Sequence, residues 1–568
     1  YTGTNATFST ATPFGNVCLN PSGLFTINGT QTLSEGTNYF WLAYDISLAI
    51  NDMNVVDAEC YSVTVRGTAY TPTVVAPIGS RTIRAALYGS ITVGSTGNYP
   101  NLTGPNGLFR KISEVGLRNH LNVVIVSDVD EPGTNALTSW YEAGGSDYHI
   151  TISPDAPVLR TISGGYAGGL IRMNNVSNIT IDGRYGGGGK YLAWINSAIS
   201  GAVAPLHLIG TAVGQGCTSI TIRDCLFSNG HNGSNTAGIY PGGASIGSSG
   251  YDHDNVSIID CNIKKSFHGI FAFGISSGTF DNLVVSGDSI GSFTPGEEIS
   301  RYGIYVQHCP GAQITGNTIF NLRGTISDMF GIYLLAGSIN STISGNMINS
   351  VRYLGTLATT KVAGIGVAPG YITSNVKIFN NVITDIIAVG NSNLASHGIA
   401  GIRIENGTGI EIYYNSVNLF GELNHPITGD VSAAIYLMTQ GDVSIKNNLL
   451  RNSLVNTAAG AYAYAIYSDM VRTGFTLIDY NDYHASGTQA RLGFCNYSVA
   501  NNIYQWRAIS LQDTHSTDQD PLYATDTDLH IDLASPACRT GNPVPGIDTD
   551  FDMVSRHPLT PTMGAYET

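Results

Sequence analysis

The chain has 568 residues and a net charge of −15, from 26 Lys plus Arg against 41 Asp plus Glu. Only 12% of its residues are charged, whereas Gly reaches 68 and Tyr 31, which favours turns and β-structure. The acidic balance argues against a nucleic acid partner, and no apolar run is long enough to span a bilayer. The eight cysteines show no CxxC spacing, which argues against an ordinary zinc site.

The chain begins with motifs that resemble a known domain. YTG at 1–3, GTNYFWLAYD at 36–45 and DAEC at 57–60 are similar to the N-terminal domain attached to BNR-repeat neuraminidase-type proteins. The resemblance implies a small β-sandwich over residues 1–82, partial because Tyr1 matches the middle of that domain. We expect a processed chain whose incomplete sandwich takes a strand from another copy and so builds a homopolymer. The alternative is that further residues precede Tyr1.

Residues 83–147 are expected to form a linker and the N-terminal cap of a solenoid. The open edge of a parallel stack invites aggregation, so a short helix that covers the first coil is the expected protection. In the segment GPNGLFRKISEVGL, four apolar residues fall on one helical face: Leu108, Phe109, Ile112 and Val115.

Residues 148–500 contain a repeat of two short alternating strands. The first strand carries an Ile after a small or aromatic pair, and these Ile recur every 28 to 37 residues: Ile270, Ile304, Ile332, Ile365, Ile402, Ile435 and Ile466. Because a short alternating strand buries one face, stacked coils gather these side chains in one internal column. The pattern predicts an all-β, right-handed parallel β-helix, a solenoid like that of pectate lyases.

The turn after the second strand of each unit carries a recurring polar residue. In six units this residue is an asparagine: Asn317, Asn346, Asn381, Asn415, Asn448 and Asn481. Amide side chains at one turn position stack on one another and satisfy backbone groups of the turn, which predicts a structural asparagine ladder. Cys225, Cys261 and Asp288 occupy the same position in earlier units. We interpret the two cysteines as stacked small side chains and not as metal ligands.

Residues 501–568 are expected to form the final coil and the C-terminal cap. Trp506, Asp513–Ser516, Asp520-Pro521-Leu522 and SPACRTGNPVPGIDTDFDMVSRHPLTPTMGAYET at 535–568 resemble the terminal part of secreted Bacteroidota right-handed β-helix proteins. The resemblance implies export by the type IX route and a place outside the cell or on its surface. It implies no defined reaction.

A polysaccharide lyase or glycosidase is the enzymatic alternative. Lyases need a base, together with a cation or an Arg that acidifies the proton next to a carboxylate. The nearest constellation is spread over adjacent coils: Lys264, Lys265, His268, Arg301, His308 and Arg323. No acidic calcium cluster accompanies it, and a fold by itself does not prove a reaction. We therefore predict a protein without catalytic residues.

The C-terminal segment contains alternating carboxylates at Asp548, Asp550 and Asp552. Carboxylate oxygens are the ligands that Ca²⁺ prefers. No bidentate Glu follows them, and the glycine-flanked loop favours an Asx turn. We therefore expect no metal and no cofactor, with calcium as the alternative.

The residue after each internal Ile points outwards, because side chains alternate along a strand. In five units it is aromatic: Phe271, Tyr305, Tyr333, Tyr436 and Tyr467. Exposed aromatic rows stack on sugar rings or on another protein. The alternative is that neighbouring rings shield one another. We predict a non-catalytic extracellular protein, adhesin-like or filament-forming, that binds glycans or copies of itself.

Overall fold

The computed structural model describes most of the chain, namely residues 1–46, 53–389, 398–423, 426–438 and 441–568. These residues form two compact units, Tyr1–Ala85 and Ala86–Thr568. None of the described helices is long and apolar enough to cross a membrane.

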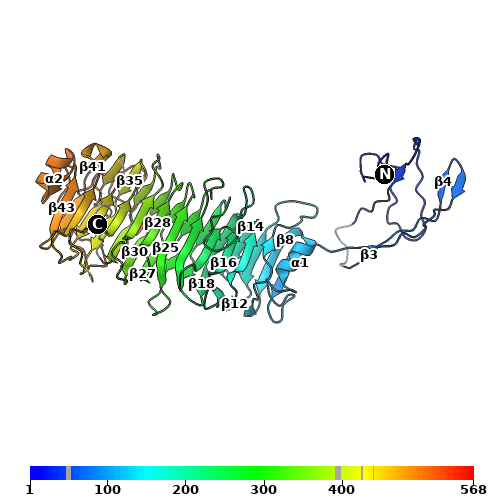
Figure 1. The fold of residues 1–568 in the computed structure, drawn as a ribbon, viewed down its shortest axis with the longest axis horizontal. Helices are drawn as coiled ribbons and strands as arrows, with labels where there is room; N and C mark the ends of the chain where they lie inside the picture. Colours follow the sequence, from blue (N-terminus) through cyan, green and yellow to red (C-terminus); the bar gives the residue numbers. More distant parts are fainter. Residues whose placement is uncertain (47–52, 390–397, 424–425, 439–440) are drawn as a thin grey trace. The chain divides into compact units, whose positions relative to one another are not determined.

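The second unit is a parallel solenoid in which each full coil gives one strand to each of three sheets (Figure 1). Sheet 1 contains β10 (Leu137–Thr138), β13 (Gly168–Asn174), β16 (Val203–Ile209), β19 (Ala237–Gly242), β22 (Ser266–Phe273), β25 (Ile299–Gln307), β28 (Met329–Leu335), β31 (Val362–Ala368), β34 (Ile399–Ile404), β37 (Val431–Leu437), β40 (Tyr462–Ser468), β43 (Ala490–Cys495) and β44 (Ser498–Ala500). All its pairings are parallel except the last, between β43 and β44.

Sheet 2 follows sheet 1 within each coil. It contains β7 (Leu87–Val93), β8 (Leu117–Ile125), β11 (Ile150–Pro154), β14 (Ser177–Asp182), β17 (Thr218–Arg223), β20 (Val256–Ile259), β23 (Val284–Ser286), β26 (Gln313–Thr315), β29 (Thr342–Ser344), β32 (Lys377–Phe379), β35 (Ile410–Tyr413), β38 (Val443–Lys446) and β41 (Phe475–Asp479). A single 3-10 turn, Arg472–Gly474, precedes β41.

Sheet 3 completes the coil. It contains β9 (Val129–Asp130), β12 (Arg160–Gly164), β15 (Leu192–Asn196), β18 (Cys225–Asn229), β21 (Asn262–Ile263), β24 (Ser289–Ile290), β27 (Thr318–Gly324), β30 (Met347–Tyr353), β33 (Val382–Ile387), β36 (Ser416–Leu419), β39 (Leu449–Asn452) and β42 (Asp482–Ala485).

The core of the solenoid is the predicted column of isoleucines. Strand pairing places Ile270 beside Ile304, and the same register continues coil by coil to Ile466. All of these side chains are fully buried. The strands alternate because one face packs into the core and the other faces outwards. The predicted all-β, right-handed parallel β-helix is confirmed.

The solenoid begins at Leu87, earlier than the predicted start near residue 148. β7 pairs in parallel with β8, and β8 pairs with β11. These first coils lack the Ile and Asn signature, so the repeat does not reveal them. The predicted cap helix is present between these two strands as α1 (Leu108–Val115), with its four apolar side chains buried against the first strands of sheets 1 and 2.

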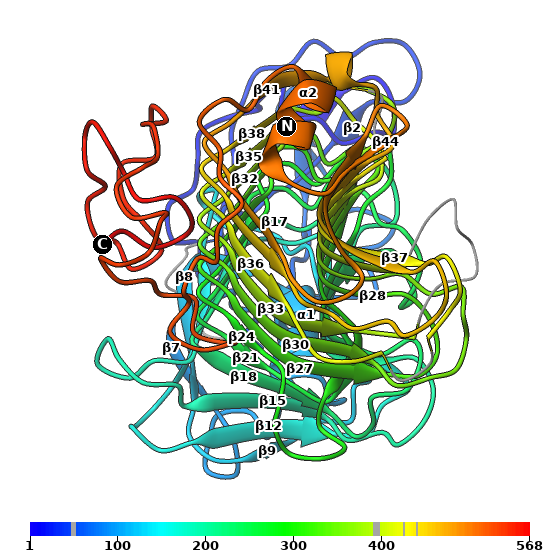
Figure 2. The same cartoon turned by 90° about the vertical axis from the view of Figure 1, so that its left-hand side faces the viewer.

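Residues 501–568, which were predicted to form the final coil and the C-terminal cap, cap the solenoid only in part. α2 (Ile503–Ser510) packs on β43 and β44 and buries Trp506, so this short helix covers the last coil. The prediction that the rest of residues 501–568 also caps the end is wrong. From about residue 520 the chain runs back along the outside of the stack, beside the turns between sheets 2 and 3 (Figure 2). We call residues 520–568 the C-terminal strap.

The first unit does not form the predicted β-sandwich. Its described residues contain three antiparallel strand pairs: β1 (Thr2–Gly3) with β2 (Tyr39–Phe40), β3 (Val55–Val56) with β6 (Arg81–Thr82), and β4 (Val63–Val65) with β5 (Thr68–Tyr70). A sandwich needs two apolar faces packed together. Here Val17, Leu19 and Leu24 are each more than 80% exposed. Completion by a strand from another copy stays a prediction.

Candidate functional site

The predicted ladder asparagines form one hydrogen-bonded stack in the turns between sheets 2 and 3. The side-chain Nδ2 of Asn346 donates to Oδ1 of Asn381 at 2.9 Å and to the Ile314 carbonyl at 2.9 Å. The backbone N–H of Asn346 also donates to Asn381 Oδ1, at 3.0 Å. The same side-chain bond joins each ladder residue from Asn317 to Asn481. With its amides occupied in this way, the ladder is structural.

The two ladder cysteines and Asp288 extend this stack towards the N-terminus. Cys225 and Cys261 are fully buried, and the Cys261 N–H donates to Asp288 Oδ1 at 2.7 Å. The Asp288 N–H in turn donates to Asn317 Oδ1 at 3.0 Å. Burial raises the pKa of the Cys225 thiol to about 12. A neutral buried thiol is a poor metal ligand, which agrees with a packing role.

Half of the lyase constellation lies away from the face of sheet 1. Lys264 and Lys265 lie between β21 and β22, where Lys264 Nζ pairs with Glu297 Oε2 at 2.7 Å. The Lys265 N–H donates to the Glu297 carbonyl at 2.6 Å. Arg323 lies on β27 in sheet 3. Lys264 and Lys265 thus lie in the turn that precedes sheet 1, and Arg323 lies on sheet 3.

The other three members lie along β22 and β25, where only His268 and Arg301 are close enough to interact. His268 is buried in a stack with the Tyr302 ring at 5.1 Å, and burial, followed by the charge of Arg301, holds its pKa well below the usual value. The Arg301 guanidinium stacks 4.4 Å from the Tyr302 ring centre. His308 follows the opposite end of β25. The six residues do not converge on one point.

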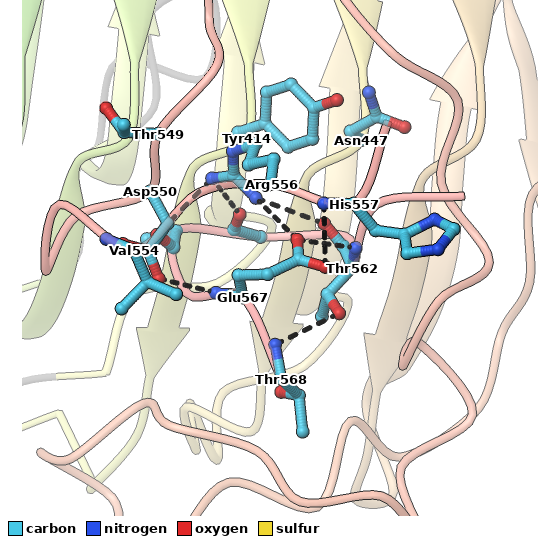
Figure 3. Close-up of polar contacts among 12 residues, drawn as sticks. Tyr414, Asn447, Thr549, Asp550, Val554, Arg556, His557, Thr562, Glu567 and Thr568 are labelled. Atoms are coloured by element: carbon cyan, nitrogen blue, oxygen red, sulfur yellow. Dashed lines mark hydrogen bonds and ion pairs between the residues drawn. The ribbon is translucent and has the colours of Figure 1, made fainter. Parts of the chain in front are cut away.

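The three carboxylates of the calcium alternative point to different partners. Asp550 is buried, and its two oxygens accept from the N–H groups of Val554 and Glu567, each at 2.7 Å (Figure 3). Asp552 accepts from His530 Nε2 at 2.9 Å, while Asp548 is exposed. Within the described ranges, no three His, Cys, Asp or Glu residues are arranged to hold a metal ion.

The predicted outward residues do share one row on the outer face of sheet 1. The row is longer than the repeat indicated, and its members in spatial order are His207, Tyr240, Phe271, Tyr305, Tyr333, Gly366, Arg403, Tyr436, Tyr467 and Phe494. The AGIY motif at 237–240 has the same pattern as the later units, so the sequence alone could have placed Tyr240 in the row. Phe494 follows a glycine instead of an isoleucine, so the Ile pattern does not find it.

Most rings of this row are buried. A surface that binds a ligand by stacking would instead expose its rings. Tyr436 is 1% exposed, and Phe271 and Tyr333 are each 9% exposed. Coils lie about 4.8 Å apart, so rings on neighbouring coils shield one another. A second row adds to this cover, since Phe330 stacks on Tyr333 at 4.0 Å. Mutual shielding therefore accounts for the buried rings of this row.

Half-buried rings remain in two places on the face, one near the middle of sheet 1 and one towards its C-terminal end. Phe273 and Tyr305 form one group, with ring centres 6.0 Å apart. Tyr462, Tyr467 and Phe494 form the other, in which the Tyr467 and Phe494 rings stack at 4.6 Å with planes 13° apart. These half-buried rings provide apolar surface, and the phenol groups of the tyrosines can form hydrogen bonds with a ligand.

Between these two groups lies a small charged cluster. Glu405 Oε1 accepts from Arg403 Nε and from Lys361 Nζ, each at 2.8 Å. Burial by itself raises the pKa of Glu405, but the charges of Arg403 and Lys361 outweigh it and leave this pKa lowered. The Arg403 guanidinium also lies 4.6 Å from the Tyr436 ring centre. The Tyr333 hydroxyl lies 3.5 Å from Glu405 Oε2, so the cluster links Tyr333 to Tyr436 across the gap at Gly366.

A family model described as "Right handed beta helix region" matches residues 215–450. Solved structures with similarity include the mannuronan C-5 epimerase AlgE4 A-module of Azotobacter vinelandii, at 12% identity and a TM-score of 0.36, covering 70% of this chain and 91% of that one. Pectate lyase Pel9A is 11% identical, with a TM-score of 0.32 and coverage of 84% and 97%.

PfbA, a surface adhesin of Streptococcus pneumoniae, is 13% identical, with a TM-score of 0.27 and coverage of 66% and 82%. No curated protein matches the chain. The family model over residues 215–450 and the three stacked parallel sheets agree on the fold: the second unit is a right-handed parallel β-helix.

Proposed function

We propose that this β-helix is a non-catalytic, adhesin-like extracellular protein that binds carbohydrate through the outer face of sheet 1. The observation that carries the proposal is the aromatic row of that face, with half-buried rings near the middle of sheet 1 and towards its C-terminal end. Aromatic rings with polar edges provide apolar contact and hydrogen bonds to a sugar at low entropic cost. The lyase alternative has less support, because its one buried histidine is covered by neighbouring rings.

The proposed location outside the cell rests on sequence resemblance. Residues 535–568 resemble the ends of secreted Bacteroidota β-helix proteins, which supports export by the type IX route. Association with copies of itself is a further part of the proposal. Its support is the first unit, where apolar side chains such as Val17 and Leu24 lie in water. Apolar surface of this kind favours contact with another chain.

The test is a binding screen of the intact chain against immobilised extracellular polysaccharides and glycans. We expect at least one ligand whose affinity falls tenfold or more in Tyr467→Ala and in Phe494→Ala, since each change removes a half-buried ring. Tyr185→Ala is the matched control, because Tyr185 is exposed in the loop between β14 and β15, outside sheet 1. Equal loss in all three variants, or no bound glycan at all, contradicts the proposal.

A further inference from the structure

A hollow lies on another side of the solenoid, between the outer face of sheet 2 and the C-terminal strap. Its volume is about 380 Å³. Its floor is made by four successive strands, β26, β29, β32 and β35, and its wall by residues 544–547. Figure 2 shows the strap along this side of the stack. The volume lies within the range of small-molecule sites, which is about 300–1,000 Å³.

The wall of the hollow is held firmly to the solenoid. The Asn542 carbonyl accepts from Asn447 Nδ2 at 2.7 Å and from the Tyr414 hydroxyl at 3.3 Å. The Asn542 N–H donates to Asn447 Oδ1 at 3.0 Å. Asn542 lies just before residues 544–547 in the chain. These bonds therefore fix the wall of the hollow against the solenoid.

The floor presents side chains that are free to bind. Thr342 and Ser344 lie on β29 and point outwards, because Ile343 between them is fully buried. Among the described residues, neither hydroxyl makes a hydrogen bond within the chain. Each hydroxyl is thus available as both donor and acceptor to a ligand in the hollow.

Two aromatic residues occupy neighbouring positions on the same floor. Strand pairing places Phe379 on β32 next to Tyr413 on β35, and both side chains are partly exposed. In contrast to the row on sheet 1, neither ring stacks on another aromatic ring in the described part of the chain. Their faces are therefore available for an apolar ring surface, such as one face of a sugar.

The charges of the floor balance each other. Lys377 Nζ lies 3.4 Å from Glu411 Oε2, and the two side chains are 58% and 38% exposed. One cation already paired with a carboxylate is a poor site for phosphate or for a polyuronate. The same pair offers both donors and acceptors to an uncharged ligand that carries many hydroxyl groups.

We propose that this hollow binds a short uncharged oligosaccharide. Phe379 and Tyr413 contact the ring faces, while Thr342, Ser344 and the Lys377–Glu411 pair bind ring hydroxyls. Four coils span about 14 Å, so the floor is longer than a single sugar ring. The site is separate from the one proposed on sheet 1 and does not depend on it.

The experiment is calorimetric titration of the full chain with cellohexaose, xylohexaose, mannohexaose and laminarihexaose, and with hexagalacturonate as the charged comparison. We expect at least one neutral hexasaccharide to bind, and its affinity to fall at least tenfold in Tyr413→Ala and in the nearly isosteric Thr342→Val. Thr180→Val is the matched control, since Thr180 lies in the same side-chain row of sheet 2, outside the hollow. Thermal melting verifies that each variant is folded.

The variants also separate the two sites. Loss of binding in Tyr413→Ala and Thr342→Val with full binding in Tyr467→Ala supports the hollow on sheet 2. Loss in Tyr467→Ala with full binding in Tyr413→Ala and Thr342→Val overturns it and leaves the sheet 1 proposal standing. Binding of hexagalacturonate alone, equal loss in Thr180→Val, or no binding of any neutral sugar also overturns it.

Discussion

At the scale of single residues, Asp288 stands out as the one acidic member of the described ladder. Its Oδ1 accepts from the Cys261 N–H, but its Oδ2 is buried without a hydrogen-bond partner among the described residues. In an asparagine the corresponding atom is the amide Nδ2, which donates to a carbonyl of the preceding coil, as Asn317 donates to Val285 at 3.0 Å. Burial therefore raises the pKa of Asp288 well above its ordinary value of 3.8.

This raised pKa predicts a pH-dependent stability. The unfolded chain loses the proton near pH 3.8, whereas the folded chain keeps it to higher pH, so the free energy of unfolding falls as the pH rises above 3.8. Asp288→Asn removes this dependence and supplies the missing donor, which should stabilise the fold by about 1–3 kcal/mol at neutral pH. Urea unfolding at pH 5 and pH 8 measures both effects.

The exposed Asp147 provides the control for this change, because Asp147→Asn alters the same charge without touching the ladder. An Asp288→Asn variant that is less stable than the wild type, or that keeps the full pH dependence, contradicts this account of the stack.

The centre of the ladder leads to a second prediction. Asn381 donates to Asn415 Oδ1 and to the Ile343 carbonyl, each at 2.9 Å, and accepts from Asn346. Asn381→Leu leaves these buried groups without partners and should lower the free energy of unfolding by about 1–3 kcal/mol. Denaturant unfolding measures the loss, and Asn119→Leu, at an exposed position on β8, serves as the comparison. An equally stable Asn381→Leu protein shows that the stack contributes nothing.

At the scale of elements, the C-terminal strap depends on Arg556. Its guanidinium lies 3.8 Å from the Tyr414 ring centre, donates to Asn380 Oδ1 at 2.8 Å and lies 3.6 Å from Glu567 Oε2 (Figure 3). It also donates to three carbonyls of the strap itself. One side chain thus joins the end of the chain to two turns of the solenoid.

Arg556→Met should therefore loosen the strap and leave the coils intact. Removing one partner of a buried ion pair costs roughly 3–5 kcal/mol, because the remaining carboxylate and carbonyls lose their donor. Limited proteolysis with peptide mapping should show new cleavage within residues 520–568, and hydrogen exchange of sheet 1 should be unchanged. Arg539→Met is the control, since Arg539 is exposed on the same strap. Similar cleavage of both variants contradicts this role of Arg556.

At the scale of the whole molecule, a solenoid of stacked coils is a scaffold whose outer faces act independently, because each coil contacts only its neighbours. Sheet 1 carries the aromatic row, and sheet 2 carries the hollow beneath the strap. Separate faces can hold separate ligands without conformational coupling. This arrangement agrees with a binding protein, in which a rigid body presents several surfaces.

The separation of the lyase residues on this scaffold predicts an inactive protein. Incubation with polygalacturonate and alginate, with or without added Ca²⁺, should release no unsaturated products absorbing in the ultraviolet, because Lys264 pairs with Glu297 and His268 is buried. Unsaturated products that disappear in Lys264→Ala, His268→Ala or Arg301→Ala contradict the prediction and favour the enzymatic alternative.

The features that repeat along the chain follow directly from its amino-acid sequence. Residues such as Ile304 and Asn346 recur once per coil, and a period of two within each strand fixes which face they bury, so the fold, the core column and the ladder followed from spacing alone. Features that depend on contacts between distant residues needed the three-dimensional fold. The burial of Tyr436 depends on rings from neighbouring coils. The course of the strap depends on the hydrogen bond from Arg556 to Asn380, which lies 176 residues away in the chain. Contacts at such separations leave no periodic trace in a sequence.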